Sequence, residues 1–181
     1  MGDTQTVTIA PAGTWELDAV HSAVGFEVEY LGGTFKGSFR EIDATLVVGE
    51  DAVSLEGSAQ VASVDVKDEN LAGHLQSPDF FDAERYPEIR FTAKNVSRDG
   101  ETVKVEGDLT IKGVTRPVEL ELEPTGVATD PFGNVRAGFE GEAQLSRKDF
   151  GLTWNVALEA GGVLVSDKVK IQLDVSAIKQ A

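Results

Sequence analysis

Apolar and polar residues alternate one by one along several stretches of this chain. Val24–Tyr30 reads Val-Gly-Phe-Glu-Val-Glu-Tyr, and the same alternation recurs in residues 103–111, 118–123 and 169–175. Successive side chains of a β-strand point to opposite faces, so each stretch has one apolar face and one polar face. Strands of this kind are typical of antiparallel sheets that expose one face to water. The alternation therefore predicts an all-β protein.

Turn-forming residues divide the chain into about eight or nine strands. The strands are predicted near residues 15–30, 34–48, 53–66, 88–96, 101–112, 116–124, 135–148 and 162–177, with a bend in the first at Ala19–His21. No change in composition marks a linker, so we expect one domain over residues 14–181, preceded by a flexible segment over residues 1–13. Long strands that each keep one apolar face favour a closed barrel, because closure removes unpaired sheet edges.

One segment lacks the alternation. Residues 69–84 are predicted to form a short helical insertion, in which Asp68 caps a helix that runs to Gln76. Ser77 is expected to cap a second turn, with Pro78 at the first position of that turn.

The net charge of the chain limits the classes of partner that it can bind. Lys and Arg number 16 against 31 Asp and Glu, so the formal net charge is −15. A field of this sign repels nucleic acid and anionic membrane surfaces, so we expect neither nucleic-acid binding nor stable membrane insertion. There are no cysteines, which excludes disulfides and thiolate metal sites. Residues 1–13 contain no basic residue and no long apolar run, so a cytoplasmic location is expected. The sequence does not decide whether the chain forms a homodimer.

Five sequence motifs point to a known family. They occur in order along residues 14–176: Trp15–Phe26, Gly33–Phe39, His74–Asp82 with Tyr86-Pro87 and Phe91, Gly107–Val118, and Arg147–Leu152 with Val165–Val169. In these motifs the sequence resembles the YceI-like family of lipocalin-like, polyisoprenoid-binding proteins. In that family an Arg-Asp pair often precedes the His-Leu of the third motif. This sequence departs from the pattern and has Leu71 and Ala72 there instead. That departure argues against an electrostatic grip of this helix on a head group.

The resemblance implies an eight-stranded antiparallel barrel with a helix near its mouth. Its elongated apolar pore would hold an isoprenoid tail, such as that of a quinone or a prenyl pyrophosphate, and the resemblance brings no catalytic mechanism. An eight-stranded barrel is either filled by its own side chains or left with room for one ligand. Four glycines fall in phase with the apolar positions and would leave such room: Gly37, Gly57, Gly107 and Gly141.

The candidate ligand-binding residues are apolar. Most lie at inward positions of the predicted strands, and Phe80, Phe81, Phe150 and Trp154 belong to loops that would shape the mouth. The strand positions are Phe26, Val28, Phe35, Phe39, Leu55, Phe91, Val105, Leu109, Leu120, Phe139 and Leu145. Phe39 and Phe139 are predicted to touch the ligand. No catalytic residue, no metal ligand and no cofactor other than bound lipid is expected.

Polar groups that could meet a head group are few. The candidates are His21, Ser22, Arg90, Arg116 and Arg147, and the alternation places Arg90 on the outer face. Two alternatives stay open. A barrel with a solid core would act as a protein interaction module, and an enzyme of small apolar substrates would use His21 or His74 as acid–base group.

Overall fold

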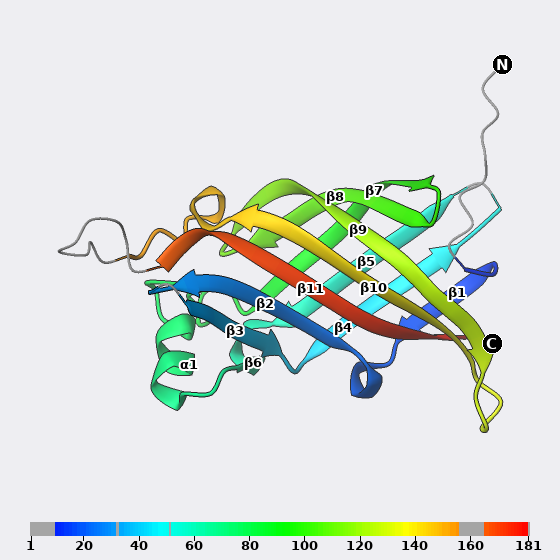
Figure 1. Ribbon diagram of the computed structural model, residues 1–181, viewed down its shortest axis with the longest axis horizontal. Helices are drawn as coiled ribbons and strands as arrows, with labels where there is room; N and C mark the ends of the chain where they lie inside the picture. Colours follow the sequence, from blue (N-terminus) through cyan, green and yellow to red (C-terminus); the bar gives the residue numbers. More distant parts are fainter. Residues whose placement is uncertain (1–9, 32, 51, 156–164, 181) are drawn as a thin grey trace, which may run out of the picture.

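The computed structural model describes residues 10–31, 33–50, 52–155 and 165–180. It is an elongated barrel with a short helix at one end (Figure 1). The strands are β1 (Gly13–Leu17), β2 (Ala23–Tyr30), β3 (Gly33–Phe39), β4 (Ile42–Val48), β5 (Val53–Gln60), β6 (Val64–Asp65), β7 (Glu88–Asp99), β8 (Thr102–Ile111), β9 (Val114–Thr129), β10 (Val135–Ser146) and β11 (Val165–Lys179). The helices are α1 (Glu69–Gln76) and the 3-10 turns η1 (Ala19–His21), η2 (Val61–Ser63) and η3 (Arg147–Phe150).

Eight antiparallel strands close the barrel, in the order β1-β4-β5-β7-β8-β9-β10-β11, and β11 pairs back to β1. The predicted all-β, lipocalin-like barrel is therefore confirmed. The strand predicted over residues 15–30 is broken by η1 into β1 and β2, as expected, and the next two predicted strands are each broken once. Residues 162–164, predicted to start the last strand, lie outside the described residues.

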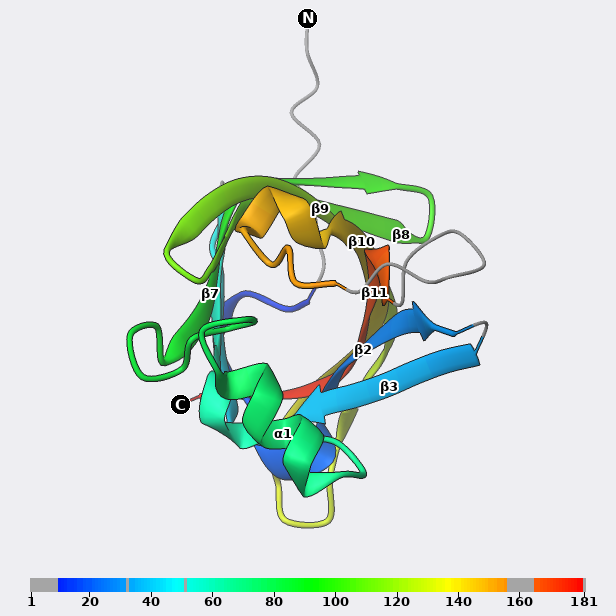
Figure 2. The same ribbon diagram turned by 90° about the vertical axis from the view of Figure 1, so that its left-hand side faces the viewer.

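The barrel differs at its two ends. Toward the end that carries α1, strands β2, β3 and β6 branch from β11, and within the described residues no strand pairing joins β6 to β7. Figure 2 shows α1 at the rim of this end of the barrel. Leu75 of α1 and Phe80 pack there against Phe39, Ala59 and Val64. We call this the helix end and the opposite end, where β1 pairs β11, the packed end.

The local sequence accounts for α1. Asp68 caps the helix as predicted, since its side chain accepts hydrogen bonds from the backbone N–H groups of Asn70 and Leu71. A second turn follows Ser77 as predicted, since the Ser77 carbonyl accepts a hydrogen bond from the backbone N–H of Phe80. The Ser77 hydroxyl does not cap that turn, and instead donates to the carbonyl of His74 at the end of α1. Residues 78–81 form hydrogen-bonded turns.

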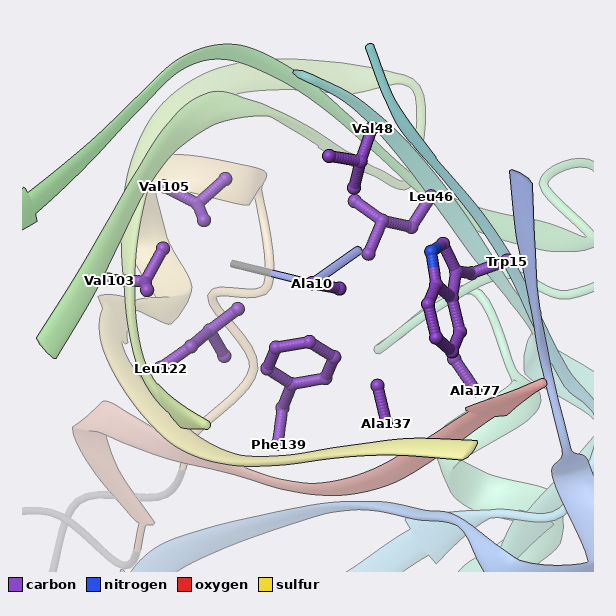
Figure 3. Packing of buried hydrophobic residues seen from close by; sticks show 10 residues of the cluster. All are labelled: Ala10, Trp15, Leu46, Val48, Val103, Val105, Leu122, Ala137, Phe139 and Ala177. Atoms are coloured by element: carbon purple, nitrogen blue, oxygen red, sulfur yellow. The ribbon is translucent and has the colours of Figure 1, made fainter. Parts of the chain in front are cut away.

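The packed end holds the main hydrophobic core. Ten buried residues meet there, and Figure 3 shows their side chains directed toward one another: Ala10, Trp15, Leu46, Val48, Val103, Val105, Leu122, Ala137, Phe139 and Ala177. This cluster includes a residue that precedes residue 14, where the domain was predicted to begin. Ala10 is only 4% exposed, Pro11 accepts a hydrogen bond from the Trp15 indole, and Gly13 begins β1, so residues 10–13 belong to the barrel.

Candidate functional site

A cavity of about 540 Å³ lies inside the barrel, between the packed end and α1. Binding pockets for small ligands span roughly 300–1,000 Å³, so this volume is sufficient for a ligand. Most of its lining residues are Leu, Ile, Val, Phe or Ala, and the charged or polar ones include Asp43, Ser58, His74 and Arg147. The lumen is thus open in the helix half and mostly filled in the other half, so a barrel that is solid from end to end is excluded.

Twelve of the fifteen candidate binding residues line this cavity: Phe26, Val28, Phe35, Phe39, Leu55, Phe80, Phe81, Phe91, Leu109, Leu120, Leu145 and Trp154. The positions of the nine strand residues among them follow from the period of two, which places alternate strand residues on the inner face. Phe26 lies between Phe35 and Phe39, with ring centroids 6.2 and 5.7 Å away. Their contact with a ligand stays a prediction.

Three candidates lie elsewhere. Val105 and Phe139 face a separate cavity of about 70 Å³ at the packed end, so the prediction that Phe139 touches the same ligand as Phe39 is not supported. Phe150 is 1% exposed and packs with Leu109 and Leu152 behind the lining. The period of two identifies an inward residue but not its level along the barrel axis, which explains why Val105 and Phe139 lie outside the large cavity. Phe150 belongs to η3, where this period does not apply.

The in-phase glycines do not leave the room that the sequence suggested. A Cβ atom at Gly37 would lie 2.5 Å from Phe26 Cζ, one at Gly107 would lie 2.6 Å from Phe91 Cζ, and one at Gly141 would lie 2.4 Å from Leu122 Cδ2. These three glycines accept the large side chain of a neighbouring strand. Gly57 alone among the four lines the cavity, and a Cβ atom there would meet only ordinary contacts.

Many lining residues were missed. The β11 residues Val169, Ile171, Leu173 and Val175 line the cavity, and they belong to an alternating stretch already visible in the sequence. Leu71, His74 and Leu75 of α1 also line it, at the i, i+3 and i+4 spacing that places residues on one face of a helix. Leu71, at which the sequence departs from the family pattern, therefore adds an apolar side chain to the cavity wall.

His74 has a defined environment at the helix end. Its ring packs edge-on against Phe80 and Trp154, with centroids 5.0 and 4.9 Å away. Its Nε2 atom lies 3.2 Å from a carboxylate oxygen of Asp79. The imidazole is thus held at the cavity wall by two aromatic rings and one carboxylate, which meets the positional requirement of the enzyme hypothesis.

Arg147 is a buried cation beside the cavity, 6% exposed. Its guanidinium donates to the carbonyls of Leu152, Trp154, Val165 and Ser166, at 2.9 to 3.4 Å. Burial lowers its pKa, and the charge of the nearby Asp167 opposes that shift. Arg147 therefore fastens the segment after η3 to the start of β11 and brings positive charge to the helix end.

The other candidate head-group donors do not line the cavity. Arg90 is exposed and pairs with Glu88 at 2.7 Å, as its outward position predicted, and Arg116 donates to the carbonyl of Asp149. Ser22 exchanges hydrogen bonds with the backbone of Ser176 on β11. These groups stabilise the barrel wall.

His21 belongs to a charged network on the outer surface. Its Nδ1 atom lies 2.6 Å from Asp18, and Asp18 also pairs with Arg136 at 2.7 Å. Arg136 in turn pairs with Asp130 at 2.8 Å. Hydrogen bonds from Arg136, aided at Asp18 by His21, lower the pKa values of Asp18 and Asp130 to about 2. The network ties η1 to the β9–β10 hairpin.

In the part of the chain that the structure describes, no group of three or more His, Asp or Glu side chains gathers in a way that would hold a metal ion. None of the helices in this part is long and apolar enough to cross a membrane.

Comparison with known proteins places the chain in a family. The profile of the YceI-like domain matches residues 15–177. Protein YceI of Escherichia coli is 33% identical over 177 residues, which cover 94% of this chain and 90% of that protein. The crystal structure of the Campylobacter jejuni YCEI protein superposes with a TM-score of 0.71 at 30% identity, covering 82% of this chain and 87% of that one. A polyisoprenoid binding domain from Saccharophagus degradans, implicated in plant cell wall breakdown, shares the fold with a TM-score of 0.71 at 14% identity, covering 92% and 98%.

Proposed function

The chain belongs to the YceI-like family, and on this premise we propose that it binds a long apolar isoprenoid ligand inside the barrel and does not transform it chemically. The observation that carries the proposal is the cavity of about 540 Å³ with its almost entirely apolar lining. The fold shared with the polyisoprenoid binding domain from Saccharophagus degradans supports the same ligand class.

Burial of the tail supplies the affinity. Each buried methylene contributes about 0.8 kcal/mol, so a five-carbon isoprene unit contributes roughly 4 kcal/mol before other terms. Association opposes this gain by about 4–15 kcal/mol through lost translational and rotational freedom. A tail of several units therefore binds without a polar contact, and the protein acts by keeping that tail out of water.

The distribution of polar groups orients the ligand. His74 and Arg147 lie at the helix end of the cavity, whereas Trp15, Val103 and Phe139 fill the packed end with apolar atoms. The tail therefore points to the packed end and the head group stays near α1. A quinone ring or a pyrophosphate suits this end, because both accept hydrogen bonds and a pyrophosphate is attracted by the charge of Arg147. We propose that the protein carries or stores such a molecule.

Native mass spectrometry and organic extraction of freshly purified protein test the proposal. The wild-type protein should carry an isoprenoid, and Phe39→Asp should lose it, because the new carboxylate lies in the apolar wall. Phe35→Asp repeats the test at a lining position that is less deeply buried. Phe132→Asp is the matched control, because Phe132 is 88% exposed on the β9–β10 turn. Circular dichroism and thermal unfolding verify that the variants are folded.

Two results would contradict the proposal. One is a wild-type protein with no added mass and no extractable isoprenoid, even after incubation with prenyl lipids. The other is the same lipid content in all variants. Recovery of an added isoprenoid with an altered mass would favour the enzyme hypothesis and direct attention to His74.

A further inference from the structure

The large cavity and the small cavity are neighbours along the barrel axis. Both are lined by the same five residues, Leu17, Ala44, Leu55, Leu122 and Val175. A residue that faces two cavities lies in the wall between them. These five residues, contributed by β1, β4, β5, β9 and β11, therefore form one layer across the lumen. We call this layer the constriction.

The constriction has defined supports. Leu122 packs over Gly141, where no side chain competes for the space, and it is 8% exposed. Ala44 lies opposite Gly57 in the β4–β5 ladder, so one side of the layer carries little bulk. Beyond the layer, Trp15 at 0% exposure and Ala10 at 4% belong to the core that fills the packed end.

From this arrangement, and resting on the proposed function, we propose that the constriction sets the length of tail that the barrel accepts. Each added carbon increases affinity only while it enters the apolar cavity. Once the tail reaches the constriction, further units extend past α1 into water and add nothing. Affinity should therefore rise with chain length up to a breakpoint and then level off.

The volumes set the scale of the effect. A five-carbon unit fills on the order of 100 Å³ at the packing density of a protein interior. The large cavity of about 540 Å³ then holds roughly five units. Truncating a leucine of the constriction would join the small cavity of about 70 Å³ to it and add the space of the lost side chain. Together these make room for about one further unit.

The test measures dissociation constants for two ladders of ligands, all-trans prenyl alcohols and straight-chain alcohols of matched carbon number, by displacement of a fluorescent apolar probe. Leu55→Ala opens the constriction at a half-buried side chain and should move the breakpoint up by about one isoprene unit. Ala44→Leu adds bulk at the side of the constriction that has only small residues, and it should move the breakpoint down to shorter chains. Val103→Ala is the control, because Val103 belongs to the packed core and lines neither cavity.

The two ladders separate this inference from the proposed function. Breakpoints that move in opposite directions in Leu55→Ala and Ala44→Leu, with Val103→Ala unchanged, support the constriction. Equal breakpoints in all folded variants overturn it, even when prenyl alcohols bind well. If only straight-chain alcohols bind, isoprenoid binding is wrong and the breakpoint on that ladder still decides the inference. If neither ladder binds, both proposals fail.

Discussion

Replacing Gly107 by alanine tests the packing of the barrel wall directly. A Cβ atom at this position would lie 2.5 Å from the carbonyl oxygen of Thr92 and 2.9 Å from Cα of Ala93. Both are backbone atoms, next to the irregular register between Ala93 and Asn95, so no side-chain rotation relieves the clash. A third contact, 2.6 Å to Phe91 Cζ, would push that ring from its place in the cavity wall.

The magnitude follows from comparison with Gly57, the matched control in β5. A Cβ atom at Gly57 would lie 3.6 Å from the carbonyl oxygen of Asp43 and 3.7 Å from Ala44 Cβ, which are ordinary contacts. Overpacking costs about 1–3 kcal/mol, and the backbone clash places Gly107→Ala at the upper limit of about 3 kcal/mol. Gly57→Ala fits without strain and should be neutral or stabilise by up to about 1 kcal/mol, because alanine has less entropy in the unfolded chain.

Denaturant titration gives the free energy of unfolding of each variant, and thermal unfolding gives an independent measure. A loss of 1 kcal/mol corresponds to roughly 2–4 °C in a chain of this size, so Gly107→Ala should melt about 6–12 °C below the wild-type protein. Gly57→Ala should melt within about 3 °C of it or higher. Equal melting temperatures for the two variants would refute the idea that Gly107 makes room for its neighbours.

Two further predictions concern charged groups. The folded pKa values of Asp18 and Asp130 are lowered, so their pairing with Arg136 should stabilise the protein above pH 4 and lose that effect as pH falls toward about 2. Arg136→Gln should flatten the pH dependence of the unfolding midpoint between about pH 4 and pH 2. An unchanged slope would contradict a stabilising role of these ion pairs. Arg147→Lys should destabilise by about 1–3 kcal/mol, measured by denaturant titration, because an ammonium group cannot satisfy all the carbonyls that the guanidinium reaches. If the denaturation midpoint of Arg147→Lys equals that of the wild-type protein, those hydrogen bonds contribute little to stability.

Local sequence was sufficient for most of the elements and for the inner and outer faces of the alternating strands. Phe26, Val28 and Leu120 line the cavity because alternate residues of a strand share one face, and this periodicity is a property of neighbouring residues alone. Asp68 begins α1 for an equally local reason, since a capping side chain bonds to the backbone two and three residues ahead. The motifs from Trp15 to Val169 indicated the family, which the matched profile confirms.

What the sequence alone determined is thus the strand periodicity, the bend at Ala19–His21, the helix after Asp68 and the inward face of the alternating strands. Only the tertiary structure decided the level of each residue along the barrel axis. Leu109 and Val105 point inward from the same strand, yet one lines the large cavity and the other the packed end. That difference depends on the register between strands distant in sequence, which sets the partners of every inward side chain.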